Sequence, residues 1–157
     1  MMDNVENKIK KLLKTAGDLY YRLILLVGNS GSGKTAVIKN LAEHYDTTLI
    51  NINLALSKEM LELTKKQRSL KLSEKLFKLV DYTKETAFLD NIEMLFDSSL
   101  KQDPLKLLQR LSRNIIIIAS WNGSINNKRL TYATPDHNEY KNYDSKDTLI
   151  VCMNDDQ

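Results

Sequence analysis

The stretch Gly28-Asn29-Ser30-Gly31-Ser32-Gly33-Lys34-Thr35 decides how this sequence folds. It matches the pattern G-x-x-x-x-G-K-[ST] in full, and it lies between the apolar run 23–27 and a helix-like segment that begins at Ala36. Its glycines let the backbone turn N–H groups inward, and the helix that follows adds its dipole at the same place. The stretch therefore predicts a loop that binds phosphate groups.

The polar residues of this loop have distinct expected roles. Lys34 should reach the β- and γ-phosphates of a nucleotide, and the Thr35 hydroxyl should bind Mg²⁺. The residues that we expect to bind the nucleotide are Gly28, Asn29, Ser30, Gly31, Ser32, Gly33, Lys34, Thr35 and Ala36. The alternative, a chance glycine-rich turn, does not account for the flanking strand and helix, so the sequence predicts ATP and Mg²⁺ as cofactors.

Asp90 is the second candidate site residue. It follows the short apolar run 86–89, which is typical of the strand that delivers a Walker B aspartate. In that position Asp90 would hold Mg²⁺ opposite Thr35, either directly or through a water molecule. The alternative interpretation is an aspartate that caps the helix after the strand.

The residue after Asp90 bears on hydrolysis. Many ATPases of this class carry a glutamate there, which orients and deprotonates the attacking water, but this chain has Asn91, whose amide cannot take the proton. Glu93 is the nearest carboxylate, so we expect it to act as the catalytic base of a slow or partner-dependent ATPase. The alternative is that Glu93 is an exposed residue in the first turn of a helix.

A further strand is expected at 114–120, where a continuous apolar run suits a central parallel strand covered on both faces. A strand inserted between the other two, with a polar residue at its tip, resembles the additional-strand P-loop group that includes AAA+ proteins. This resemblance implies that Asn122 touches the γ-phosphate or the water, although Asn122-Gly123 is equally a good turn. Trp121 is expected to pack in the core. Arg129 is the first candidate for an arginine supplied across a subunit interface, with an ordinary surface arginine as the alternative.

Helical and strand patterns alternate along the chain. Helices are expected at 4–16, from Ala36 to Tyr45, from a cap at Ser57 to Lys66, after a cap at Ser73, and at 104–113, and the two middle ones could form one kinked element. Strands are expected at 22–27, 47–53, 86–89, 114–120, 130–133 and 148–153. This order predicts a single domain over 1–157, with an N-terminal amphipathic helix at 4–16, a three-layer α/β/α P-loop core with a mostly parallel sheet at 22–153, and a tail at 154–157.

Composition excludes several other classes of protein. The chain of 157 residues is 42% hydrophobic and 27% charged, with a net charge of +3, which is typical of one globular domain. No apolar run approaches the roughly 20 residues that a membrane span needs, and the N-terminus has no apolar signal core. With one cysteine in an apolar run, these features predict a cytoplasmic protein. Lysines that crowd the middle of the chain alternate with acidic residues, which favours a solvated helix face over a nucleic-acid surface.

With these motifs in place, the chain resembles the BrxF family, the small P-loop proteins of BREX bacteriophage-defence systems. The resemblance covers nearly the whole length and depends on GNSGSGKT, FLDNIE, IIIIASWNGS and LTYATPDHNEY. It implies an ATP-binding or ATP-hydrolysing component that acts beside a DNA methyltransferase, a PglZ-type phosphatase-like protein, a helicase and a larger ATPase. Contact with DNA, directly or through those partners, and assembly with other copies of the chain both remain open from the sequence. Compared with AAA+ proteins, we expect this sequence to lack the C-terminal helical lid and the sensor-2 arginine.

Two other functions remain open from the residues alone. A small-molecule kinase would suit a P-loop domain of this size, but such kinases often carry acidic residues after the second strand, where this chain has Asn51-Ile52-Asn53. A nucleotide-dependent interaction module that binds ATP and hardly hydrolyses it is the other, and Asn91 favours it.

Overall fold

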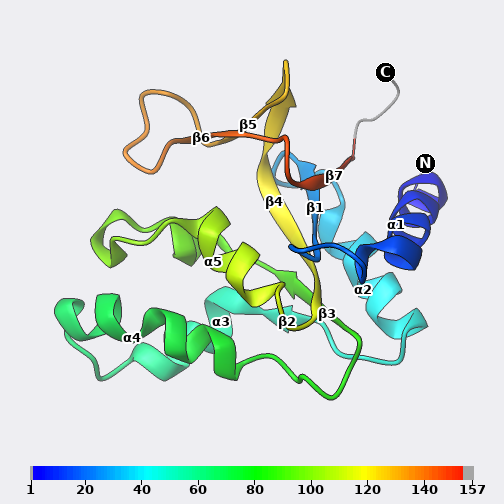
Figure 1. The fold of residues 1–157 in the computed structure, drawn as a ribbon. Coiled ribbons are helices and arrows are strands. Elements are labelled where there is room, and N and C mark those ends of the chain that lie inside the picture. Colours follow the sequence, from blue (N-terminus) through cyan, green and yellow to red (C-terminus); the bar gives the residue numbers. More distant parts are fainter. Residues whose placement is uncertain (1, 154–157) are drawn as a thin grey trace.

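The computed structural model describes residues 2–153, so the expected tail at 154–157 lies outside the described residues. Its central sheet is parallel throughout (Figure 1). The strands follow the order β2 (Ile50–Asn51), β3 (Thr86–Asp90), β4 (Ile116–Asn126), β1 (Leu23–Gly28) and β7 (Leu149–Cys152). The late strand β4 therefore lies between the P-loop strand β1 and the aspartate strand β3, as the sequence predicts.

Helices cover both faces of this sheet, which confirms the expected three layers (Figure 1). One face carries α1 (Met2–Ala16) and α2 (Lys34–His44); the other carries α3 (Ile52–Met60), α4 (Lys65–Lys78), α5 (Pro104–Leu111) and the short 3-10 helices η1 (Glu93–Phe96) and η2 (Ser98–Leu100). Among the helices of residues 2–153, none combines the length and the apolar character that crossing a membrane requires.

The strand β1 contributes to the core on both faces of the sheet. Leu23, Leu25 and Val27 pack with the helices α3 to α5, whereas Ile24 and Leu26 pack with α1 and α2. Successive side chains of a strand point to opposite faces, so a strand between two helical layers must be apolar at every position. This is why the run before the P-loop shows no alternation.

The segment after β1 and α2 differs from the expectation at three points. The strand expected at 47–53 is reduced to Ile50–Asn51, because the Asn51 side chain accepts a hydrogen bond from the Leu54 N–H (3.0 Å) and starts α3 there. Ser57 and Ser73 lie inside helices, so their assignment as caps is wrong. Thr64 begins α4 instead, through a capping box with Gln67.

The strand β4 runs past the sheet and carries an antiparallel extension, β5 (Arg129–Tyr132) and β6 (Lys141–Asp144) (Figure 1). Asn122 and Gly123 lie within β4, so the alternative of a turn at these residues is wrong. A Cβ on Gly123 would stand 1.9 Å from the Thr131 carbonyl oxygen, so only glycine permits this approach of the two strands. Beside it the buried Trp121 donates Nε1–H to the same oxygen (3.0 Å), as befits its expected packing role.

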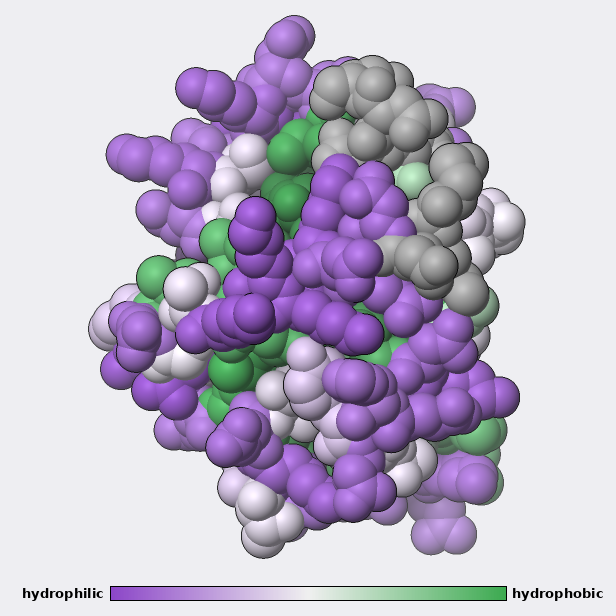
Figure 2. Space-filling view, turned by 90° about the vertical axis from the view of Figure 1, so that its right-hand side faces the viewer, coloured by the Kyte–Doolittle hydropathy of each residue, from purple (hydrophilic) through white to green (hydrophobic). Residues whose placement is uncertain are grey.

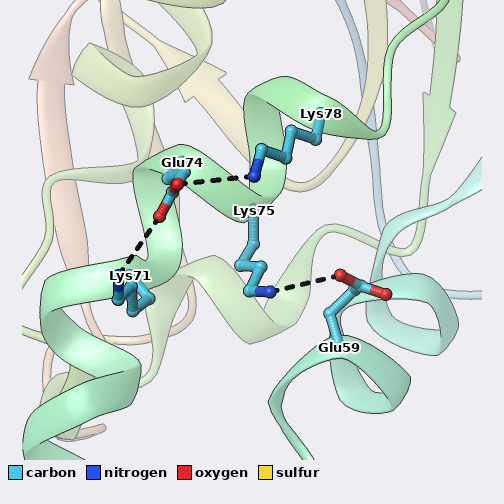
Figure 3. Close-up of polar contacts among 5 residues, drawn as sticks. All are labelled: Glu59, Lys71, Glu74, Lys75 and Lys78. Atoms are coloured by element: carbon cyan, nitrogen blue, oxygen red, sulfur yellow. Dashed lines mark hydrogen bonds and ion pairs between the residues drawn. The ribbon is translucent and has the colours of Figure 1, made fainter.

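The lysines in the middle of the chain form ion pairs on the surface of α3 and α4 (Figure 3). Glu74 lies within 3.6 Å of Lys71 and 3.4 Å of Lys78, one turn away on either side, and Lys75 reaches Glu59 of α3 at 3.4 Å. Charges of both signs therefore alternate over this face, as expected of a solvated helix surface.

Candidate nucleotide-binding site

The P-loop joins β1 to α2 through backbone conformations that suit glycine. Gly31 (φ 80°) and Gly33 (φ 99°) are both in the left-handed region, and Gly33 directly precedes the first residue of α2. At Gly28 a Cβ would lie 2.6 Å from the Ser32 hydroxyl and 3.0 Å from the Met153 side chain. The loop is therefore closely packed, with the N-terminus of α2 beside it.

Lys34 is the buried cation of this loop, with 6% of its surface exposed. Its Nζ donates hydrogen bonds to the carbonyl oxygens of Gly28 (2.8 Å) and Asn29 (2.7 Å), so the ammonium is held inside the curve of the loop. Burial lowers the pKa of Lys34, whereas the negative charges of Asp90 and Glu93 act in the opposite direction.

Asp90 and Thr35 meet across the site. The Thr35 hydroxyl donates to Oδ2 of Asp90 (2.6 Å), and the buried Ser120 hydroxyl of β4 donates to Oδ1 (2.6 Å). The carboxylate is thus bonded at both oxygens and is held at the carboxyl end of β3, beside the middle of β4. The carboxylate faces the P-loop, which fits the Walker B interpretation. A helix cap would accept hydrogen bonds from backbone N–H groups, whereas Asp90 accepts them from these two hydroxyls, so the cap interpretation does not fit.

The donor set of Thr35 and Asp90 fits Mg²⁺. Mg²⁺ prefers hard oxygen ligands, and protein sites usually offer one or two carboxylates and leave the remaining positions to water and to substrate phosphates. A hydroxyl and a carboxylate 2.6 Å apart, beside a phosphate-binding loop, match this requirement. Within residues 2–153 no cluster of three or more acidic, histidine or cysteine side chains could hold a metal ion without such added ligands.

Glu93 faces the same site from the start of η1. It is half-buried, so the alternative of an exposed helix residue is wrong, and its oxygens accept hydrogen bonds from the side-chain amides of Asn53 (3.2 Å) and Asn122 (3.0 Å). Burial raises the pKa of Glu93 above its ordinary value, and the charge of Asp90 adds to the effect. Hydrogen bonds to the carboxylate and the charge of Lys34 oppose this rise in pKa without cancelling it.

Asn91 turns the chain between these two carboxylates. Its φ of 52° is left-handed, a conformation that asparagine tolerates better than most residues, and its carbonyl oxygen accepts a hydrogen bond from the Asn53 N–H (2.8 Å). The left-handed backbone conformation therefore explains why asparagine suits this position. The turn also places Glu93 over the site.

A cavity of about 300 Å³ unites these groups. Its lining residues are Ser30, Gly31, Gly33, Lys34, Thr35, Asp90, Asn91, Glu93, Ser120 and Asn122. The structure thus brings together every predicted catalytic or metal-binding residue of the chain with one exception. Arg129 is exposed on β5, pairs in register with Asn126 beyond the site, and bonds Asn142 (2.7 Å). Its role across a subunit interface stays a prediction.

Three further residues of the site escaped the sequence analysis. Ser120 donates a hydrogen bond to Asp90, and Asn53 donates one to Glu93. The Met153 side chain packs against Gly28, and it lies 3.5 Å from the position that a Cβ on Gly33 would occupy. Ser120 could have been noticed as the one polar residue that ends the apolar run 115–119. Asn53 and Met153 carry no such signal, because only the parallel order of the strands brings them to the P-loop.

Comparison with known proteins agrees with this geometry. The family described as the P-loop containing dynein motor region matches residues 5–116. Eleven solved chains are similar in structure, among them PCH-2 of C. elegans, with a TM-score of 0.54 and 21% sequence identity. That similarity covers 97% of this chain but 42% of the PCH-2 chain, and at this identity it concerns the fold alone. No curated protein sequence matches.

The fold, the strand order and the P-loop define an AAA-type P-loop ATPase domain. The chain belongs to the family of the P-loop containing dynein motor region. The family match ends at Ile116, the first residue of β4. The extension β5–β6 and the strand β7 therefore lie outside the matched region.

Proposed function

We propose that this domain binds ATP with Mg²⁺ and hydrolyses it slowly until a partner or a conformational change releases Glu93. One observation carries the proposal: Thr35, Asp90 and Glu93 line one cavity with Lys34 of the P-loop. When bound, Mg²⁺ would supply positive charge that offsets the negative charge of the phosphates. Thr35 and Asp90 would hold it, and Lys34 would turn from the loop carbonyls to the phosphates.

Hydrolysis needs a base that can accept a proton from water. Glu93 is the nearest carboxylate after Asp90, but both of its oxygens are engaged by amide donors. A carboxylate held in this way is a poor base until at least one amide moves. This supports slow turnover of the isolated protein, and it also supports the second candidate, an interaction module that binds ATP with negligible hydrolysis.

Phosphate release separates these candidates. Purified protein should release phosphate from ATP slowly, and Glu93→Gln should abolish the release, whereas Asn91→Ala should leave a measurable rate. A brisk rate that Glu93→Gln does not change overturns the assignment of the base. The same assay with DNA tests stimulation of hydrolysis. ADP formation without phosphate release, in the presence of a panel of kinase acceptors, would support the alternative of a small-molecule kinase.

We further propose that the domain acts in a BREX-type phage-defence complex, as a regulatory or motor-like component. The support is the resemblance of the sequence to BrxF proteins, above all in ASWNG and TYATPDHNEY. In this proposal its partners are the other BREX proteins, further copies of the chain, and DNA. Co-expression with a BREX methyltransferase and a PglZ-type protein should yield a stable complex that survives size-exclusion chromatography; separate elution of all three would contradict it.

A further inference from the structure

A second cavity lies at the opposite end of the sheet from the P-loop. It has a volume of about 880 Å³ and opens between α1, the end of α2 and the first residues of β3 and β4. Its lining residues are Asn7, Lys10, Lys11, Leu13, Lys14, His44, Tyr45, Thr47, Thr83, Lys84, Glu85, Thr86 and Ile116. None of them lines the cavity at the P-loop, so the two cavities are separate.

The charge of this cavity is strongly one-sided. Lys10, Lys11 and Lys14 reach it from α1 and Lys84 from the loop before β3, against the single carboxylate Glu85. Among the residues that the structure describes, no carboxylate forms an ion pair with Lys10, Lys11 or Lys14. This differs from α4, whose lysines at 71, 75 and 78 all have glutamate partners (Figure 3).

The side of the molecule that carries α1 and α2 is shown in Figure 2, where hydrophilic side chains dominate and apolar ones are visible only between them. Four lysines around one hollow repel each other, which costs free energy in the absence of an anion. Lys84 is held in place by a hydrogen bond from its Nζ to the uncharged Asp46 carbonyl oxygen (3.1 Å). Asp81, which does not line the cavity, interacts electrostatically with Lys84.

An aromatic side chain shares the cavity with these lysines. Tyr45 is 40% exposed; its ring stacks near Phe88 (6.2 Å between centroids) and meets the edge of His44 (4.8 Å). A ring that is fixed by such neighbours and still partly exposed can stack with a nucleobase. Lysines that bind successive phosphates beside an aromatic platform are the combination by which proteins bind single-stranded nucleic acid.

We propose that this cavity, which we name the α1 cavity, binds a short single-stranded nucleic-acid segment. Lys10, Lys11, Lys14 and Lys84 contact its phosphates and Tyr45 stacks on a base. The nucleic acid would occupy a site separate from the nucleotide at the P-loop, since the two cavities share no lining residue. Phosphate and carboxylate anions would both be attracted to the lysines, but a ring to stack on favours the nucleobase-bearing ligand.

The test is binding of a fluorescein-labelled dT12 oligonucleotide, followed by fluorescence anisotropy over a range of salt concentrations. With four lysine contacts, the logarithm of the binding constant should fall against the logarithm of the salt concentration with a slope of about −3, at about −0.7 per phosphate. The variant Lys10→Gln/Lys11→Gln/Lys14→Gln should bind at least about tenfold more weakly and reduce this slope by about 2. Glutamine keeps the aliphatic stem, so folding, checked by circular dichroism, should be unchanged.

The matched control removes the same charge elsewhere. Lys71→Gln/Lys75→Gln/Lys78→Gln should keep the wild-type affinity and slope, and Lys34→Ala should keep them too. Tyr45→Ala should weaken oligonucleotide binding about fivefold or more but leave the binding of tripolyphosphate unchanged. The proposal is overturned if dT12 does not bind, or if the control variant loses as much affinity for dT12 as Lys10→Gln/Lys11→Gln/Lys14→Gln does. It is also overturned if tripolyphosphate or a glutamate decamer displaces labelled dT12 as well as unlabelled dT12 does.

Discussion

At the scale of single residues, the burial of Glu93 determines how the rate of hydrolysis should depend on pH. Its carboxylate lies half-buried beside Asp90, and burial raises the pKa of Glu93. A base must be deprotonated, so activity should fall as the pH falls through this raised pKa, above the ordinary value of a glutamate. A pH–rate profile of phosphate release should show this acidic limb, and Glu93→Asp should keep a reduced but similar limb. An acidic limb at the ordinary glutamate pKa would contradict the buried assignment.

Ser120 gives a second prediction at this scale. Its hydroxyl is buried and bonds one oxygen of Asp90, so Ser120→Ala leaves a buried acceptor without its donor and should cost about 1–3 kcal/mol of unfolding free energy. Because Asp90 would also lose its orientation, we expect weaker Mg²⁺ dependence of ATP binding, measured by titration calorimetry.

Ser112 provides the control for Ser120. It is equally buried and bonds the Gln109 carbonyl oxygen (2.7 Å) at the end of α5, away from the cavity. Ser112→Ala should reduce stability without changing the Mg²⁺ dependence. An equal change of Mg²⁺ dependence in both variants would show that Ser120 acts through stability alone.

At the scale of secondary-structure elements, the pairing of β4 with β5 depends on one glycine. A Cβ on Gly123 would collide with the Thr131 carbonyl oxygen, and the strands would have to separate. Gly123→Ala should therefore cost about 1–3 kcal/mol. It should also disturb the fluorescence of Trp121, the only tryptophan of the chain, which bonds the same oxygen.

Urea denaturation measures this loss, and Gly17→Ala serves as its control. A Cβ on Gly17 would meet its nearest atom at 3.9 Å, an ordinary contact distance. Equal stability of the two variants would mean that β4 and β5 do not approach each other as closely as the structure has them.

The helices α3 and α4 begin at other caps than the expected Ser57 and Ser73. Serine favours a cap wherever it occurs near a helix start, so Ser57 and Ser73 were plausible, but the apolar positions of both helices begin earlier. Thr64→Ala should cost about 1 kcal/mol by removing the capping box, whereas Ser73→Ala should be nearly neutral. Chemical denaturation compares the two, and a larger loss at Ser73 would contradict the observed boundary.

What the sequence predicted well had strong local signals. The helix at the N-terminus, the strand before the P-loop and the strand that ends at Asp90 each follow an apolar pattern with a clear end. The strand β5 was expected at 130–133 and is confirmed at Arg129–Tyr132. The strand β6 was not expected, because it is short and alternates between exposed and half-buried residues. Likewise Lys34, Thr35 and Asp90 belong to motifs, whereas Asn53 and Met153 reach the site only through the order of the strands.

At the scale of the whole molecule, nucleotide binding should stabilise the fold. A ligand that binds only the folded state adds about 2.7 kcal/mol when its concentration is 100 times its Kd, which corresponds to a rise in Tm of about 5–10 °C for a domain of this size. Mg²⁺ and ATP should produce this rise in a thermal shift assay. Lys34→Ala should abolish it, whereas Lys39→Ala, which removes an exposed lysine of the same helix, should not. An unchanged shift in Lys34→Ala would refute the assignment of the P-loop.

The strand order has a consequence for synthesis of the protein. Both neighbours of β1 in the sheet, β4 and β7, are encoded after residue 115, and Met153 packs over the glycines of the loop that β1 carries. A nascent chain that has left the ribosome as far as α5 therefore contains the complete motif 28–35 but neither strand that supports it. The phosphate-binding loop is therefore translated before the strands that complete its native surroundings, so premature capture of nucleotide by an unfinished chain is disfavoured.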